Sequence, residues 1–122
     1  MPKTENHQLK AELRYFTGSE QFYRNPLFPG YRYTEGVQYM AEKAGAYWLI
    51  DYILSNQPDK QLKEQRFQTW KIHVTHEDKA IITVDDGDGN QLQQFRLSHT
   101  DFPFEHFTLW LVDSVLMLPS EY

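Results

Sequence analysis

The chain of 122 residues contains no cysteine, which excludes disulfide bonds, thiolate metal sites and cysteine nucleophiles. It also lacks a long apolar run. The longest one in the region 33–54 covers residues 44–50, far short of the roughly 20 residues of a membrane-spanning helix. The first eight residues are polar, without the apolar core of a secretion signal. These absences predict a cytoplasmic protein that does not bind membranes.

Basic residues are scarce. The chain has 12 Lys and Arg against 17 Asp and Glu, a net charge of −5, and no Lys or Arg follows Arg96. Proteins that bind nucleic acid neutralise phosphates with clustered positive charge. This composition predicts that nucleic acid is not a partner.

Motifs that carry chemistry are absent as well. The sequence has no Gly-x-Ser-x-Gly, no P-loop, no Gly-x-Gly-x-x-Gly and no His-Glu-x-x-His. Asp86, Asp88 and Asn90 alternate as in a calcium-binding loop, but Gln91 replaces the required Gly and Leu97 the required Glu. We therefore interpret 85–90 as a hairpin turn.

The histidines offer a weak metal-binding pattern. His73 and His76 fall on opposite faces of a strand, so they form no ligand pair there. His99, Asp101 and His106 surround one loop and could converge, although Asp101 before Phe102-Pro103 is typical of an Asx turn. We expect no metal, no cofactor and no catalytic residue.

A helix is predicted over 34–54, with Thr34 as its N-cap and Glu35 in its first turn. From Ala44 to Leu54 its only charged residue is Asp51, so the rest of the chain or a second copy must cover most of its circumference. Gly45 is interpreted as part of a small-residue surface for close packing.

Aromatic residues are concentrated before this helix, with seven between Tyr15 and Tyr33. Such a loop is expected to dock on the core, because disordered segments are poor in aromatics. A short helix is predicted over 5–16, with Thr4 as its N-cap.

Beyond the central helix, the apolar period changes from 3.6 to 2 residues, which is typical of strands. Five strands are predicted, over 69–74, 80–84, 93–98, 107–112 and 115–118. The expected fold is therefore a single α+β domain, residues 1–122, in which a mostly antiparallel meander of four or five strands packs on one long central helix, with a short N-terminal helix.

The hairpin 107–118 is apolar on both faces and has no Lys or Arg. An exposed edge of this kind would aggregate, so it should be covered by a helix or loop on one side and by a partner or the aromatic loop on the other. We therefore expect a homodimer, or another protein partner, at this hairpin or at the aromatic face around Trp48.

Two hypotheses for function follow from these patterns. The leading one is a non-enzymatic protein-binding or accessory module, since apolar and aromatic surface is plentiful. The alternative is a small-ligand binder or enzyme that uses Tyr, Arg and carboxylate groups near the central helix. Its site would be formed by Arg24, Tyr33, Glu35, Tyr39, Asp51 and Tyr122.

The C-terminal segment 118–122 is expected to be ordered. Leu118 would lie in the core, Tyr122 on the helix or the aromatic loop, and Glu121 near Arg24 or Arg32. Any ligand pocket should lie against this tail.

Five sequence blocks resemble a family of small bacterial domains of unknown function. They are Phe16-Thr17-Gly18-Ser19-Glu20, Tyr33-Thr34-Glu35-Gly36-Val37, Ala46-Tyr47-Trp48-Leu49-Ile50-Asp51, Thr100-Asp101-Phe102-Pro103 and Leu118-Pro119-Ser120-Glu121-Tyr122. The resemblance implies an accessory gene of cyanobacteria, plasmids or other mobile elements, and it assigns no chemical role to any block. Asp113-Ser114 departs from the Asn-Gly turn that the family tends to have.

Overall fold

A computed structural model describes residues 6–18 and 21–122. Thr4, the predicted N-cap of the first helix, lies outside these residues. One mixed sheet of seven strands forms the centre of the domain. Its strands are β1 (Phe22–Arg24), β2 (Arg32–Thr34), β3 (Phe67–Val74), β4 (Ala80–Asp85), β5 (Gln91–Leu97), β6 (His106–Val112) and β7 (Val115–Met117). The helices are α1 (His7–Leu13), α2 (Glu35–Ala44) and α3 (Tyr47–Ser55), followed near the C-terminus by the 3₁₀ turn η1 (Pro119–Glu121).

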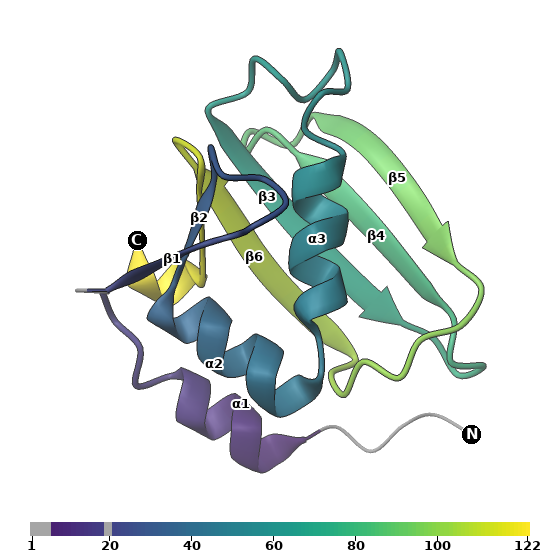
Figure 1. Ribbon diagram of the computed structural model, residues 1–122. Coiled ribbons are helices and arrows are strands. Elements are labelled where there is room, and N and C mark those ends of the chain that lie inside the picture. Colours follow the sequence, from purple (N-terminus) through teal and green to yellow (C-terminus); the bar gives the residue numbers. More distant parts are fainter. Residues whose placement is uncertain (1–5, 19–20) are drawn as a thin grey trace.

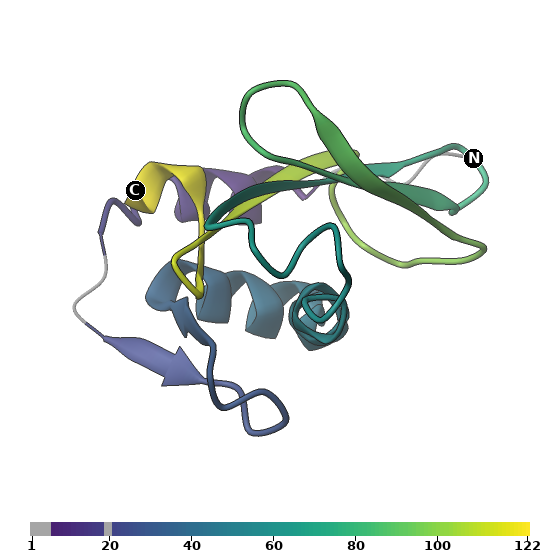
Figure 2. The ribbon, with the colours of Figure 1, turned by 90° about the horizontal axis from the view of Figure 1, so that it is seen from above.

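The helices α2 and α3 lie on one face of the sheet, and none of the described helices crosses the opposite face of β3, β4 and β5 (Figures 1 and 2). We call this uncovered side the open face. Among the described helices, none combines the length and the apolar character needed to cross a bilayer.

The expectation of one long central helix is wrong, because two helices meet at Gly45. Gly45 has φ 63°, and its N–H donates to the carbonyl of Ala41. Glycine adopts this left-handed conformation without the clash that a Cβ would cause, so it ends α2. The chain then turns into α3, which runs in a different direction (Figure 1). The predicted N-cap is confirmed, since the Thr34 hydroxyl accepts the N–H of Val37.

The expected antiparallel meander of four or five strands is also wrong. The strand order is β1-β2-β7-β6-β3-β4-β5, so the chain crosses from β5 at one edge to β6 on the other side of β3. The strands β2 and β7 pair in parallel. The two additional strands lie within the aromatic segment and have three residues each, too short for a period of two to be recognised.

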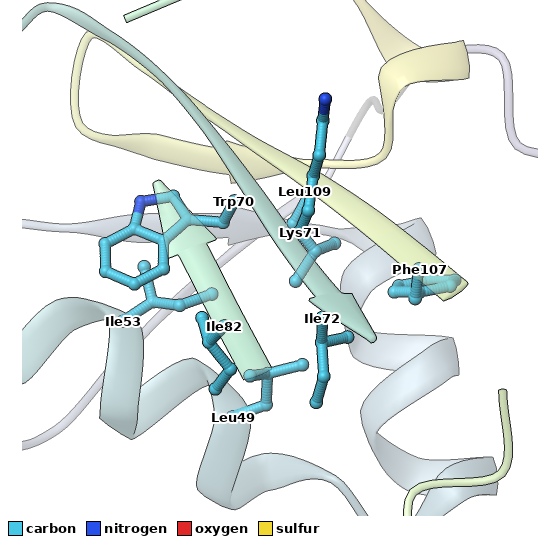
Figure 3. A pocket seen from close by; sticks show the side chains of 8 residues that line it. All are labelled: Leu49, Ile53, Trp70, Lys71, Ile72, Ile82, Phe107 and Leu109. Atoms are coloured by element: carbon cyan, nitrogen blue, oxygen red, sulfur yellow. The ribbon is translucent and has the colours of Figure 1, made fainter. Parts of the chain in front are cut away.

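The core lies between α3 and the sheet. Leu49 and Ile53 of α3 face Trp70, Ile72 and Ile82, while the ammonium of Lys71 extends away from them (Figure 3). The cavity among these side chains measures about 10 Å³, close to the smallest volume that holds one water. It is a packing gap in a dense core and not a ligand site.

A buried amide pair joins the connector after α3 to β3. Gln57 Nε2 donates to Gln68 Oε1 at 3.0 Å, and Gln68 Nε2 donates back to Gln57 Oε1 at 2.8 Å. The indole N–H of Trp70 donates to the same Gln68 oxygen. These polar groups satisfy one another, as buried polar groups must, and the network therefore has a structural role.

Candidate functional site

Two of the six predicted site residues, Tyr33 and Asp51, meet at a pocket of about 170 Å³. Asp51 extends from α3, which holds its carboxylate beside the loop that joins β1 to β2. Its Oδ1 accepts a hydrogen bond of 2.7 Å from Nδ2 of Asn25. The remaining lining consists of Pro26, Leu27, Tyr47 and Ile50. Asp51 is thus half-buried and partnered, not exposed along a solvent-facing stripe.

Asn25 organises the loop on the other side of the pocket. Its Oδ1 accepts the N–H groups of Leu27 and Phe28, at 2.8 and 3.2 Å, which closes an Asx turn. Sequence reasoning did not include Asn25 or Tyr47 in the site. An Asn before Pro is a turn signal, and it could have identified Asn25 as the residue that shapes the loop.

The phenol of Tyr33 is held in its neutral form. Burial raises its pKa, and the nearby Tyr47, Tyr23 and Asp51 raise it further. The pocket therefore presents one carboxylate, which accepts hydrogen bonds, and phenol groups that donate or accept them. This arrangement can orient a small polar molecule, but its lining contains no histidine, lysine, serine or threonine.

The structure does not bring Arg24, Glu35 or Tyr39 to the lining of this pocket. Arg24 is exposed on β1, directly opposite Arg32 of β2. Glu35 Oε1 accepts the N–H of Gln21 at 3.1 Å.

Tyr39 lies on the far side of α2, where its ring contacts Phe16 with centroids 5.4 Å apart. The ammonium of Lys43 is 5.6 Å from the same ring. Desolvation and a hydrogen bond with Glu12 raise the pKa of this phenol. Tyr39 therefore helps to fasten the segment after α1 to α2.

The C-terminal tail is ordered, and Glu121 closes it onto the start of α2. Its Oε1 accepts the Thr34 hydroxyl at 2.6 Å and the N–H of Leu118 at 3.0 Å, while Oε2 accepts the N–H of Gly36 at 3.2 Å. A carboxylate is favourable there because the first N–H groups of a helix carry partial positive charge and lack intrahelical partners. Leu118 is buried in the core as expected.

The expected position of Tyr122, on the helix or the aromatic loop, is wrong. The ring instead packs edge-on against Trp110 and Phe67, with centroids 5.4 and 6.2 Å away. We call Phe67, Trp110 and Tyr122 the aromatic patch. Tyr122 remains 75 % exposed, so the patch is accessible to a partner.

A groove of about 400 Å³ lies against the tail, whereas the lining of the Asp51 pocket includes no residue of the tail. It is lined by Lys10, Leu13 and Arg14 from α1, by Phe107 and Thr108 from β6, and by Leu118, Pro119 and Ser120 from the tail. We call it the tail groove.

The β6–β7 hairpin is covered at both edges, and one of the neighbouring strands comes from the aromatic segment. It lies inside the sheet, with β3 on one side and β2 on the other. One of its faces is buried through Leu109, Leu111 and Leu116. The opposite face consists of the half-buried Trp110, Val112, Val115 and Met117, and this face alone is left for a partner.

The acidic segment 85–90 forms a hairpin turn, as its sequence indicates. Asp86 Oδ1 accepts the N–H groups of Asp88 and Asn90, and Oδ2 accepts the Asn90 amide. These bonds, led by that of the Asn90 side chain, lower the pKa of Asp86. The Asp86 carboxylate thus stabilises the turn through hydrogen bonds with residues of the same turn.

Comparison with known proteins finds no curated protein and no solved structure that matches the chain. A family model described as a family of unknown function, DUF6876, matches residues 7–122. This match covers nearly the whole chain and indicates no specific activity. The chain therefore belongs to the DUF6876 family of unknown function.

Proposed function

We propose that this domain is a non-enzymatic protein-binding module that forms a homodimer through the aromatic patch and the adjoining outer side of the β6–β7 hairpin. One observation carries the proposal: the rings of Phe67, Trp110 and Tyr122 pack against one another, and Tyr122 is still 75 % exposed. Exposed apolar surface of this kind marks protein contacts.

The packing of α3 limits which surface can form the dimer interface. Its apolar residues Leu49, Ile50 and Ile53 are at most 2 % exposed, so this side of α3 is not available to a second copy. On the open face, Lys71 and Asp85 are 4.0 Å apart and offset each other's charge. Two copies with net charge −5 can therefore approach here without strong local repulsion.

The biological setting belongs to the same proposal. The resemblance described above supports a cytoplasmic accessory protein of bacteria, encoded on plasmids or other mobile elements. A module that acts through protein contacts suits such a role, because it needs no catalytic machinery of its own.

Light scattering coupled to size-exclusion chromatography tests the dimer. We expect a mass twice that of the 14.6 kDa chain for the wild type and a single-chain mass for Tyr122→Ser combined with Met117→Lys. The control is Tyr15→Ser, since Tyr15 is 85 % exposed on the segment after α1 and should leave the dimer intact. A wild-type chain that stays monomeric at high concentration would refute the proposal.

The Asp51 pocket supports small-ligand binding as a second candidate function, because it brings together two of the residues predicted to bind a ligand. Its volume of about 170 Å³ is below the 300–1,000 Å³ of typical ligand pockets, so only a small molecule would fit. A thermal-shift screen of small hydrogen-bond donors, such as amines and amides, tests this candidate. Stabilisation that disappears in Asp51→Asn would support it, and a screen without any stabilising compound would count against it.

A further inference from the structure

Strand pairing places His73 of β3 directly opposite His106 of β6. The adjacent Val74 N–H donates to the carbonyl of Glu105 at 2.8 Å, so the next pair, His73 and His106, occupies a non-hydrogen-bonded position. Opposite side chains approach most closely at such positions. The two imidazole rings lie with their centroids 4.2 Å apart and their planes inclined by 31°.

The carboxylate of Glu105 lies beside these two histidines. Glu105 immediately precedes β6, and its Oε1 lies 3.4 Å from Nε2 of His106. His73, Glu105 and His106 each offer one ligand atom, and these three atoms lie within 4.8 Å of one another. All three residues are exposed, at the point where β3 ends and β6 begins.

We propose that His73, Glu105 and His106 form a binding site for a divalent transition-metal ion, with Zn²⁺ as the ion they fit best. Two imidazoles and one carboxylate are a donor set that suits Zn²⁺, Cu²⁺ or Ni²⁺, whereas Mg²⁺ and Ca²⁺ prefer sites built from oxygen alone.

The geometry requires only small side-chain movements. Ligand atoms about 2.1 Å from one tetrahedral zinc ion are roughly 3.4 Å apart, so the three exposed side chains would close from 4.8 Å by rotating about their χ angles. The backbone already fixes two of the ligands, because the ladder between β3 and β6 holds the histidines face to face. Three protein ligands leave a fourth position for water or for a further ligand.

The positive charge of the neighbouring Lys71 does not prevent a cation from binding at this site. Lys71 is two residues before His73 on the same face of β3, and its ammonium lies beside Asp85 of β4, 4.0 Å from Oδ2. The positive charge is therefore held toward β4 and away from β6.

This proposal departs from the sequence-based expectation of no metal ligand. The sequence grouped His106 with His99 and Asp101 by proximity along the chain, while His73 is separated from His106 by two strands and their turns. Only the pairing of β3 with β6 reveals the site.

Isothermal titration of the metal-free full-length protein with ZnCl₂ tests the site. We expect one Zn²⁺ per chain, with affinity reduced at least about tenfold in each of His73→Gln, Glu105→Gln and His106→Gln, as for the loss of a group that directs a metal site. The matched controls are His76→Gln and His99→Gln, two exposed histidines outside the group. Neither control should change the affinity, and MgCl₂ should give no binding signal.

A second measurement separates loss of binding from loss of structure. Zn²⁺ should raise the melting temperature of the wild type and of both controls but not that of His73→Gln, while circular dichroism shows the same fold for all of them. The proposal is overturned if the wild type binds no Zn²⁺ at millimolar concentration. It is equally overturned if the control variants lower the affinity as much as His73→Gln does.

Discussion

The C-terminal tail packs closely against Gly36 in the first turn of α2, where there is no room for a side chain. A Cβ built on this residue would lie 2.6 Å from Cδ1 of Leu118 and 2.7 Å from Oε1 of Glu121. The blocks around Gly36 and Glu121 are two of the five that carry the family resemblance. Their meeting at this point shows that both have a structural role, since one supplies the helix start and the other the carboxylate that caps it.

We predict that Gly36→Ala destabilises the domain by about 1–3 kcal/mol, the usual cost of overpacking a filled site. Alanine favours a helix over glycine by about 1 kcal/mol, but this gain is smaller than the loss, because Leu118 and the Glu121 carboxylate must both move. Urea denaturation measures the difference.

The control for this substitution is Gly30→Ala. A Cβ at Gly30 meets nothing within 4 Å, and its φ is not in the left-handed region, so stability should stay equal or rise slightly. Equal unfolding midpoints for Gly36→Ala and the wild type would show that the tail is not tightly packed on α2.

At the scale of elements, the turn between β6 and β7 has an unfavourable local sequence. Asp113 and Ser114 have φ of 47° and 69°, as in the type I′ turn that Asn-Gly normally forms. Two hydrogen bonds with Arg66 offset the steric cost of this conformation at Asp113. The Asp113 N–H donates to the Arg66 carbonyl, and Asp113 Oδ1 accepts from Arg66 Nε at 3.1 Å. The sequence identified this turn correctly.

We predict that Ser114→Gly stabilises the domain by about 1 kcal/mol, since glycine adopts positive φ without the steric cost that serine carries. Ser114→Ala is the matched control, and it should give no gain because alanine keeps the Cβ. Thermal and urea unfolding of the two variants measure the effect. A midpoint for Ser114→Gly at or below that of the wild type would mean that the turn is unstrained.

At the scale of the whole molecule, a single chain crossing joins elements that are distant in sequence. The passage from β5 to β6 inserts β6 between β3 and β7, and β7 then pairs with β2 from the first third of the chain. This arrangement fastens the tail to α2, leaves β1 and β5 as the edges of the sheet, and brings His73 opposite His106. The aromatic patch and the proposed metal site are both consequences of this crossing, because each joins a residue of β3 to a residue of β6.

The sequence by itself determined the local structure: the strand segments from 67 to 117, the helix start at Thr34, the turns at 85–90 and 113–114, and the place of Leu118 in the core. These depend on periodicity, capping and turn chemistry, which act between residues a few positions apart. It also grouped Tyr33 with Asp51, which line one pocket, yet it placed Arg24, Glu35, Tyr39 and Tyr122 in the same group. Only the tertiary structure decided that Gly45 divides the helix, that β6 joins β3, and that Tyr122 lies on the open face, because strand order and long-range pairing depend on which apolar faces cover one another.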